Sequence, residues 1–374
     1  MLFTGSGTGV SSYARQLRRA HQAIGDYRLL ADRPALDQPP PAPFGRVGRW
    51  VRALLPGARV ARLADGVEGT RFFAPDIFRL AQVYFDVHRR PLPVRLPGPP
   101  GIMHWTYPVP LTVVGWRNVY TVHDVIPLLH PTLTHINGHR YRRILDRLGE
   151  SAAGFIAVSE TAREEIVRTL GCAQSFVTDC GLAVDAAPAD PNRLPASVAS
   201  GHFLLLCGTM EKRKNVASAL AAYRESKVEM PLVLAGPDGW GAERIAAEIA
   251  ATPGVIRLPY LDREAMHALI GNARALLMPS LAEGFGLPVA EAMALGVPVV
   301  TSDRGALAET AGGAALTIDP RDIAAIARAI RRVADDDALC AALSVDGLRN
   351  AERFRPERFA ERLTRAYAAV MAAG

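Results

Sequence analysis

Two carboxylates eight positions apart stand out in the C-terminal half of the chain. Glu283 lies in the glycine-containing loop 279–286, directly after an apolar strand, and Glu291 lies in the helix expected to begin at Leu287. Pro288 fits the first turn of this helix, because its missing N–H would have no helical partner. Glycines let backbone N–H groups approach a phosphate, and a carboxylate accepts hydrogen bonds from vicinal hydroxyls. The pattern predicts a nucleotide site.

Two adjacent cations follow another apolar strand. Arg213 and Lys214 end the segment 208–214, which comes after strand 202–207 and before a helix expected from residue 215. The carboxyl ends of parallel strands meet at one edge of a sheet, so these cations should lie beside the loop of Glu283. An arginine fork and a mobile lysine together predict a diphosphate clamp. The alternative for all four side chains is a solvated surface.

The elements that must position these groups alternate between strands and helices. In the second half the expected strands are 202–207, 232–235, 255–258, 275–278 and 298–301, and the intervening helices begin at 215, 242, 263 and 287. In the first half, a helix over 11–23 follows the glycine-rich segment 5–9, and the expected strands are 2–4, 101–105, 118–122 and 154–158. This alternation predicts an α/β fold with mainly parallel, doubly wound sheets.

Two proline-rich segments suggest breaks between these elements. Residues 37–43 predict a loop, and residues 188–200 predict a linker between two Rossmann-like domains, 1–190 and 201–355. The last segment, 356–374, spaces Phe359, Leu363 and Tyr367 four apart, which predicts an amphipathic helix that must dock on another surface.

Composition limits the class of protein. The 374 residues are 49% hydrophobic and 21% charged, which is typical of globular chains, and no apolar run reaches about 18 residues. The N-terminus lacks a leader pattern, so a cytoplasmic location is expected. The four cysteines have no metal-ligand or disulfide spacing. The net charge is +6, and the first 100 residues hold 15 Arg against 7 Asp or Glu, which suits an anionic partner.

Residues 203–320 resemble the retaining family-4 glycosyltransferases of the GT-B fold. The matching motifs are Gly208–Asn215, Pro279–Pro288, Glu291–Met293 and Gly296–Val299. The resemblance continues more loosely through Gly7–Gly9, Tyr120–Pro127 and Ala157–Glu160. It implies two Rossmann-like domains that face a cleft, with the C-terminal helix crossing back to the N-terminal lobe.

The resemblance also implies roles for individual residues. Arg213 and Lys214 would hold the diphosphate of a nucleotide-sugar donor, Glu291 its ribose, and Glu283 the hydroxyls of the transferred sugar. His123, at the end of an N-lobe strand, would face the sugar across the cleft and bond to it or to the acceptor. The remaining implied donor contacts are Gly9, Thr209, Tyr260, Leu261, Gly284, Phe285, Gly286 and Leu287. Thr209 stands where some relatives have Arg, so the clamp would depend more on Arg213 and Lys214.

The segments 104–110 and 120–124 are similar to those of bacterial exopolysaccharide mannosyltransferases of the xanthan and acetan type. This implies GDP-mannose as donor and a lipid-linked oligosaccharide as acceptor. A UDP- or dTDP-sugar with a soluble acceptor, and a non-catalytic nucleotide- or anion-binding GT-B protein, remain alternatives. Because the clamp supplies positive charge and no cluster has metal-ligand spacing, we expect no metal cofactor and activity in EDTA.

Residues 45–55 combine apolar helical spacing with flanking arginines. This pattern favours a short interfacial helix on an anionic membrane, with contacts from Arg46, Arg49, Trp50, Arg52 and Leu54. An ordinary helix packed on the N-lobe is the alternative.

Two other functions find less support. A nicotinamide fingerprint, Gly-x-Gly-x-x-Gly, would need glycine at Val10 or Ser12. No nucleic-acid-binding motif accompanies the basic N-terminal residues, so no nucleic-acid partner is expected.

Overall fold

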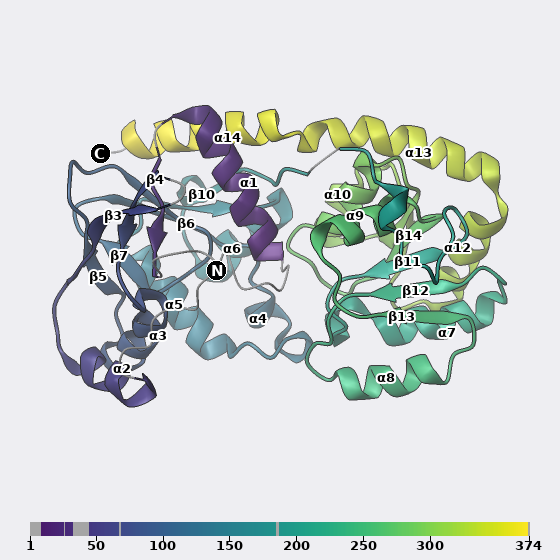
Figure 1. Cartoon of the computed structure of the whole chain (residues 1–374), viewed down its shortest axis with the longest axis horizontal. Coiled ribbons are helices and arrows are strands. Elements are labelled where there is room, and N and C mark those ends of the chain that lie inside the picture. The colour runs from purple at the N-terminus through teal and green to yellow at the C-terminus, as the bar shows by residue number, and fades with distance from the viewer. Residues whose placement is uncertain (1–8, 26, 33–44, 67–68, 185–186, 373–374) are drawn as a thin grey trace.

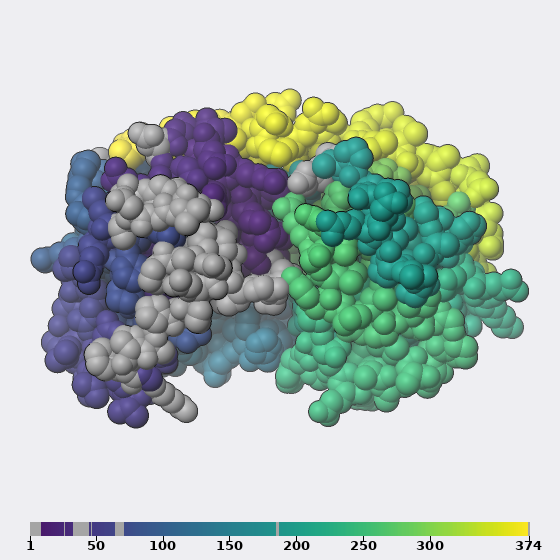
Figure 2. All heavy atoms as spheres, in the orientation of Figure 1, coloured from purple at the N-terminus to yellow at the C-terminus, as the bar shows by residue number. Residues whose placement is uncertain are grey.

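The computed structural model describes residues 9–25, 27–32, 45–66, 69–184 and 187–372. They form two lobes joined along one side by the C-terminal helices (Figure 1). The space-filling view shows this C-terminal segment, in yellow, running along the edge of both lobes (Figure 2). The expected strand 2–4 and loop 37–43 lie outside the described residues.

The C-terminal lobe is built on a six-stranded parallel sheet of order β13-β12-β11-β14-β15-β16. Its strands are β11 (Leu204–Cys207), β12 (Leu232–Ala235), β13 (Val255–Leu258), β14 (Ala275–Met278), β15 (Val299–Ser302) and β16 (Leu316–Ile318). Its helices are α7 (Val216–Ser226), α8 (Ala242–Ala250), α9 (Arg263–Gly271), α10 (Leu287–Ala294), α11 (Gly305–Ala311), α12 (Ile323–Asp335) and α13 (Asp337–Ala351).

The predictions for this lobe are confirmed with small shifts at the ends of elements. Strands β11, β12, β14 and β15 are buried along their whole length, which is why they appear in the sequence as continuous apolar runs. The chain order reverses between β11 and β14, and the crevice at such a reversal is where open α/β sheets bind ligands. The motifs that begin at Gly208 and Pro279 follow these two strands.

The N-terminal lobe contains a four-stranded parallel sheet, β10-β9-β8-β6, and two three-stranded sheets, β1-β4-β3 and β2-β5-β7. The strands are β1 (Leu30–Ala31), β2 (Arg59–Val60), β3 (Arg62–Gly66), β4 (Gly69–Phe73), β5 (Leu92–Arg95), β6 (Ile102–Trp105), β7 (Leu111–Val113), β8 (Arg117–Thr121), β9 (Gly154–Ala157) and β10 (Val177–Asp179). The helices are α1 (Gly9–Ile24), α2 (Gly45–Leu54), α3 (Ile77–His88), α4 (Ile126–Leu129), α5 (Gly138–Gly149) and α6 (Glu160–Leu170).

The three expected strands at 101–105, 118–122 and 154–158 are β6, β8 and β9, and they pair in parallel as predicted. One feature departs from the expected parallel sheet, because β3 and β4 form an antiparallel hairpin. This hairpin lies between residues 25 and 100, where the sequence carried few strand signals.

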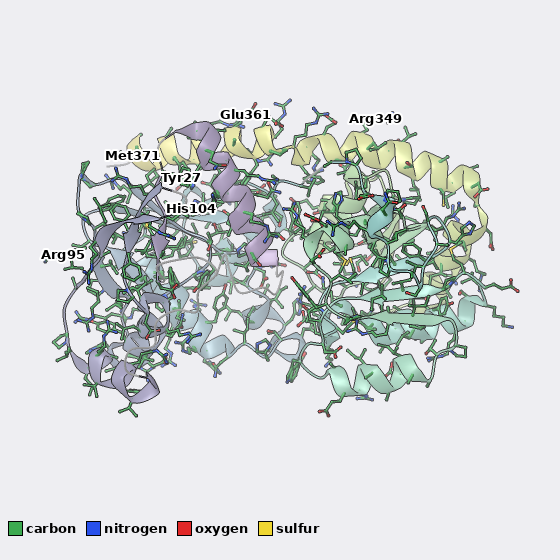
Figure 3. All side chains as sticks on the ribbon, viewed as in Figure 1. Tyr27, Arg95, His104, Arg349, Glu361 and Met371 are labelled. Carbon is green, nitrogen blue, oxygen red and sulfur yellow. The ribbon has the colours of Figure 1, made fainter. Side chains whose placement is uncertain are left out.

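Helix α14 (Pro356–Ala372) crosses back to the N-lobe, which confirms the prediction for the C-terminal segment. Phe359 and Leu363 are fully buried, and the Phe359 ring lies 6.0 Å from that of Tyr13 in α1. Figure 3 shows how the C-terminal helices pass from one lobe to the other, with Arg349 of α13 on the C-lobe side and Met371 near the end of α14 on the N-lobe side. The two lobes are therefore tied together by an apolar contact between α1 and α14.

A chain of hydrogen bonds reinforces the same junction. The Tyr367 hydroxyl lies 2.7 Å from His21 Nε2 and 2.5 Å from His104 Nδ1. On the other side of the imidazole, His104 Nε2 lies 2.7 Å from Thr121 Oγ1, which lies 2.7 Å from the Tyr13 hydroxyl. The five side chains come from α1, β6, β8 and α14.

One direction of donation gives both tyrosine hydroxyl hydrogens an acceptor within this cluster. If Tyr13 donates to Thr121 and Thr121 to His104, then His104 Nδ1–H donates to Tyr367, which donates to His21. The opposite direction would leave the buried Tyr13 hydroxyl hydrogen without an acceptor in the cluster. Burial lowers the pKa of His21 to about 4 and that of His104 well below its usual value, so both rings are neutral at pH 7.

Candidate active site

A cavity of about 820 Å³ lies between the lobes at the carboxyl edge of the C-lobe sheet. It is lined from the C-lobe by the segments after β11 and β14 and by the start of α9. From the N-lobe it is lined by the first turns of α1 and by His123 and Asp124, which follow β8. Each predicted donor contact lines it: Gly9, Thr209, Arg213, Lys214, Tyr260, Leu261, Gly284, Phe285, Gly286, Leu287 and Glu291.

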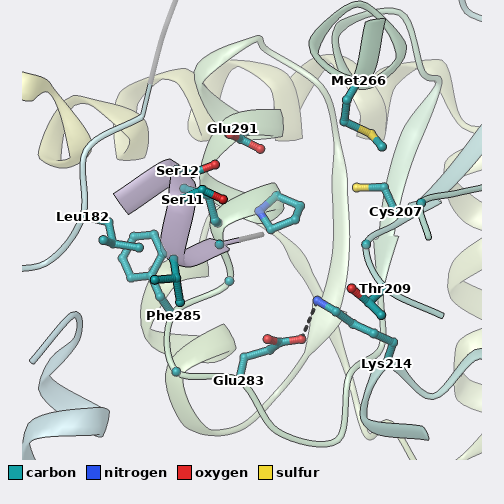
Figure 4. Close-up of a pocket in the computed structure, with 18 of the residues that line it drawn as sticks. Ser11, Ser12, Leu182, Cys207, Thr209, Lys214, Met266, Glu283, Phe285 and Glu291 are labelled. Carbon is teal, nitrogen blue, oxygen red and sulfur yellow. Dashed lines mark ion pairs between the residues drawn. The ribbon is translucent and has the colours of Figure 1, made fainter. Parts of the chain in front are cut away.

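Glu283 is held between the two predicted clamp cations. Its Oε1 lies 2.8 Å from Lys214 Nζ, the ion pair marked in Figure 4. Its Oε2 accepts a hydrogen bond from Arg213 Nη1, which also donates to the Ala282 carbonyl at 3.1 Å. The Glu283 and Lys214 side chains are 9% and 8% exposed. The solvated alternative for these residues is therefore wrong.

These contacts fix the charge of Glu283. Burial alone would raise its pKa, but the adjacent Arg213 guanidinium and Lys214 ammonium lower the pKa to about 2. Burial would lower the pKa of Arg213, but Glu283 and Glu211 raise it instead. Glu283 and Arg213 are thus both ionised at pH 7. A carboxylate with so low a pKa accepts hydrogen bonds well and is a poor proton donor.

Glu211 orients the Arg213 guanidinium from the opposite side. Its Oε1 accepts from Arg213 Nη2 at 2.8 Å and from Nε at 3.1 Å. The sequence motif suggested two cations available for a diphosphate, whereas the structure gives each a carboxylate partner. A bound diphosphate would therefore share the cations with Glu283 and Glu211.

The loop around Gly284 also belongs to the boundary between the lobes. A Cβ at Gly284 would lie 2.2 Å from the His123 carbonyl oxygen, so only glycine allows this approach. Two residues later Gly286, with φ of 102°, immediately precedes α10, where a side chain would also be strained. Gly284 thus lets the two lobes approach each other closely at the His123 backbone, and both glycines also line the cavity.

His123 presents one ring nitrogen to the protein. Its Nε2 lies 2.8 Å from the Thr106 carbonyl, to which it donates, so Nδ1 carries the lone pair. Burial lowers its pKa, against the effect of this hydrogen bond. The ring packs edge-on against Tyr13 at 5.0 Å. A neutral His123 at the cavity can accept a hydrogen bond from a hydroxyl, as the prediction for this residue requires.

The two ends of the cavity differ in chemistry. Glu283 and Lys214 form one end, and Glu291 and Met266 lie at the other (Figure 4). Tyr260, which is 43% exposed, and Leu261 follow β13 and line the cavity, as expected of residues that frame a base. The arrangement can hold an elongated ligand with an anionic centre near Lys214.

Several lining residues were not predicted from the sequence. Ser11, Ser12 and Arg15 reach the cavity from α1, and Asp124 and Arg263 also line it. Arg15 Nη2 donates to Ser12 Oγ at 3.0 Å. For Ser11, Ser12 and Arg15 the signal in the sequence is their position in the first turns of the helix that follows the glycine-rich segment 5–9.

The helix expected over residues 45–55 is α2, and it exposes its apolar side chains. Val47, Trp50 and Leu54 are 75%, 45% and 60% exposed, so they do not pack against the N-lobe sheet. Ala53 is buried instead. Of the predicted contacts, Arg49 pairs with buried Asp76 at 2.5 Å, Arg52 is half-buried, and the side chain of Arg46 lies outside the described residues.

Among the described residues, no group of three or more His, Cys, Asp or Glu side chains is placed to hold a metal ion. None of the helices within the described ranges has the length and apolar character that a membrane span requires.

Comparison with known proteins gives consistent matches. Residues 196–348 match the family described as glycosyl transferases group 1. The chain is 34% identical over 266 residues to O-antigen chain mannosyltransferase B of Escherichia coli, covering 67% of this chain and 70% of that protein. It is 28% identical over 278 residues to the E. coli serotype-specific mannosyltransferase WbdA, covering 67% of this chain and 33% of that protein. A solved structure, sucrose-phosphate synthase from Thermosynechococcus elongatus, matches with a TM-score of 0.70 at 18% identity, covering 98% and 95% of the two chains.

Proposed function

We propose, since this chain belongs to the group 1 glycosyltransferases, that it transfers mannose from GDP-mannose to a lipid-linked oligosaccharide during O-antigen or exopolysaccharide assembly. The predicted GT-B fold and glycosyltransferase activity are confirmed. The observation that supports the site is the buried cluster of Arg213, Glu283 and Lys214 at the reversal of the strand order. The names of the relatives support mannose, while family 4 and the xanthan and acetan type remain predictions.

In the proposed reaction the leaving group is a nucleoside diphosphate. Its negative charge grows as the bond to the sugar breaks, and preorganised cations stabilise such charge most effectively in a site shielded from water. Arg213 and Lys214 supply that charge, and Glu211 keeps the guanidinium in place. Glu291 accepts hydrogen bonds from the ribose, and Glu283 from the sugar hydroxyls. No metal ion is needed in this proposal.

We propose that transfer retains the anomeric configuration through attack on the face that the diphosphate leaves. The acceptor hydroxyl gives its proton to a leaving-group oxygen. A covalent intermediate on Glu283 is the alternative, but a carboxylate paired with two cations and with a pKa of about 2 is a weak nucleophile. His123 Nδ1 accepts a hydrogen bond from the sugar or the acceptor.

The test begins with nucleotide binding. GDP, UDP and dTDP are titrated in a thermal-shift assay, and a ligand at 100 times its Kd stabilises the folded state by about 2.7 kcal/mol. We expect GDP to raise the melting temperature most. Transfer from GDP-mannose to a lipid-linked acceptor is then measured with and without EDTA, and equal rates are expected.

Each part of the proposal can fail separately. Stronger stabilisation by UDP or dTDP would exclude GDP-mannose as the donor. Loss of transfer in EDTA, with recovery on adding a divalent cation, would exclude a metal-independent clamp. Transfer to a soluble acceptor alone would exclude the lipid-linked acceptor. Nucleotide binding without transfer or donor hydrolysis would favour a binding protein.

We also propose that α2 meets the membrane that carries the acceptor. Exposed apolar side chains such as Trp50 and Leu54 insert into an interface, while an adjacent arginine such as the half-buried Arg52 attracts anionic headgroups. The protein is expected to bind anionic vesicles, and to lose that binding in high salt because charge attraction is screened. Exchanging Trp50 and Leu54 for serine is expected to remove most of the binding, as measured by vesicle flotation.

The matched control is Trp240→Ser, because Trp240 is 53% exposed on the C-lobe and lies outside α2. We expect this variant to bind vesicles like the unaltered protein. Donor hydrolysis without acceptor is expected to be unchanged in all variants. Vesicle binding that ignores salt and survives the changes in α2 would contradict the membrane contact.

A further inference from the structure

The start of α6 in the N-lobe is capped by a carboxylate from the C-lobe. Glu309 of α11 accepts hydrogen bonds from the backbone N–H groups of Glu160 and Thr161, both at 2.8 Å, and from Thr161 Oγ1 at 2.6 Å. A carboxylate is stabilised at a helix N-terminus because the first N–H groups lack helical partners and the helix dipole is positive there. The partner of this helix end is thus supplied by the other lobe.

Ser159, the N-cap residue of α6, makes a second contact between the lobes. Its Oγ accepts from Ala162 N at 3.0 Å within the helix and donates to the Gly284 carbonyl at 2.8 Å. Gly284 is also the residue that approaches the His123 carbonyl. The N-lobe therefore contacts the backbone of the loop that carries Glu283.

Thr310, next to Glu309, connects these two contacts within the C-lobe. Its Oγ1 donates to the Phe285 carbonyl at 2.6 Å, and the side chain is fully buried. Phe285 and Glu283 lie close together on the loop that borders the cavity (Figure 4). One turn of α11 thus contacts both the N-lobe helix and the donor-site loop.

We propose that Glu309 is a positioning residue, and that Ser159, Thr161, Gly284, Glu309 and Thr310 form an interlobe latch. The latch holds the lobes closed and, in the same contacts, fixes the backbone of the Glu283 loop. On the side of the C-terminal helix the lobes are tied by buried apolar groups such as Phe359 and Leu363. The latch is instead polar and solvent-accessible at Glu160, so water can replace its hydrogen bonds when the lobes separate.

The latch couples closure to catalysis for a geometric reason. Arg213, Lys214 and Glu291 belong to the C-lobe and can bind a nucleotide when the lobes are apart. His123 belongs to the N-lobe and reaches the sugar only when they are together. Loss of the latch should therefore slow transfer more than it weakens nucleotide binding. This inference rests on the glycosyltransferase activity and is independent of which sugar or base is used.

The test compares Glu309→Ala, Glu309→Gln and the control Glu243→Ala, which removes an exposed carboxylate from the first turn of α8. We expect turnover at saturating donor to fall about tenfold in Glu309→Ala, the change produced by about 1.4 kcal/mol. Glu309→Gln should fall less, because the amide oxygen still accepts a hydrogen bond. The Kd for nucleoside diphosphate should stay within about twofold in all three variants.

Two further measurements separate positioning from a general loss of structure. Small-angle X-ray scattering should show a larger radius of gyration for Glu309→Ala than for Glu243→Ala. Thr161→Val should slow transfer when it is the only change. It should add little to the effect of Glu309→Ala, because both changes remove the hydrogen bond from Thr161 Oγ1 to Glu309.

Unchanged turnover with an unchanged radius of gyration would overturn the latch. A joint decline of nucleotide affinity, melting temperature and turnover would also overturn it, because that result indicates a structural role for Glu309. If the protein uses another donor than GDP-mannose, the proposed function fails while the scattering and turnover tests of the latch still apply with that donor.

Discussion

Replacing Glu283 with alanine is expected to lower the rate of sugar transfer about 100- to 1000-fold, the range found when one hydrogen-bonding group that acts in the transition state is removed from an active site. The change removes the acceptor for the sugar hydroxyls and leaves Arg213 and Lys214 without their shared partner. Steady-state kinetics at saturating donor measure the effect. Near-normal turnover would contradict the assignment of this site.

The structure adds a consequence for stability. Because the Glu283 side chain is 9% exposed and is the carboxylate partner of Lys214, its loss leaves the buried Lys214 charge without that partner, while Arg213 keeps Glu211. We therefore expect Glu283→Ala to unfold at a lower temperature. Glu283→Gln keeps the volume and one hydrogen-bond acceptor but not the charge, so it should be equally poor in transfer. A well-folded but inactive Glu283→Gln would separate the chemical role from the structural one.

The low pKa of Glu283 sets the pH range of this ion-pair cluster. The pKa falls from 4.5 to about 2 in the folded protein, so the unfolded chain binds the proton more readily. The stabilisation from the cluster is then fully present above about pH 4.5 and is lost as the pH falls towards about 2. Protonation of Glu283 is not expected to affect the rate of transfer between pH 5 and 8.

Replacing Lys214 with alanine is expected to weaken the binding free energy of the donor by roughly 1.5–3 kcal/mol, the range for a lost charge-assisted hydrogen bond. This corresponds to about a tenfold to hundredfold weaker affinity. Turnover should fall as well, because the same ammonium faces the charge that develops on the leaving diphosphate. Calorimetric titration with nucleoside diphosphate measures the first effect directly.

Lys212 offers a matched control in the same turn. It is exposed, whereas Lys214 is 7% exposed with its Nζ in the ion pair with Glu283. Lys212→Ala removes an equal charge a short distance away and should leave the Kd nearly unchanged. Equal losses of affinity in both variants would indicate general electrostatic attraction in place of a specific clamp.

The sequence by itself determined the order of the elements and the location of the donor site. Buried parallel strands such as β12 and β14 are short runs of apolar residues between turn residues, so they can be recognised without knowledge of their neighbours. Residues that follow such strands lie at one edge of the sheet. For this reason Arg213, Lys214 and Glu283 could be predicted to meet although 69 positions separate Lys214 from Glu283.

The hairpin of β3 and β4 and the exposed face of α2 depended on packing that the sequence does not encode locally. The helical pattern of α2 was visible, but the same pattern suits a helix packed on a sheet or one facing solvent. Only the tertiary structure decided that Trp50 and Leu54 are exposed while Ala53 is buried.

Contacts between distant segments were likewise decided by the tertiary structure. Glu309 and Thr161 are 148 positions apart, and neither belongs to a pattern that marks a shared site. The same is true of His104 and Tyr367, whose hydrogen bond depends on how α14 crosses the N-lobe. Local sequence specifies which backbone groups a helix end leaves unpaired, but the residue that satisfies them is set by how the two lobes meet.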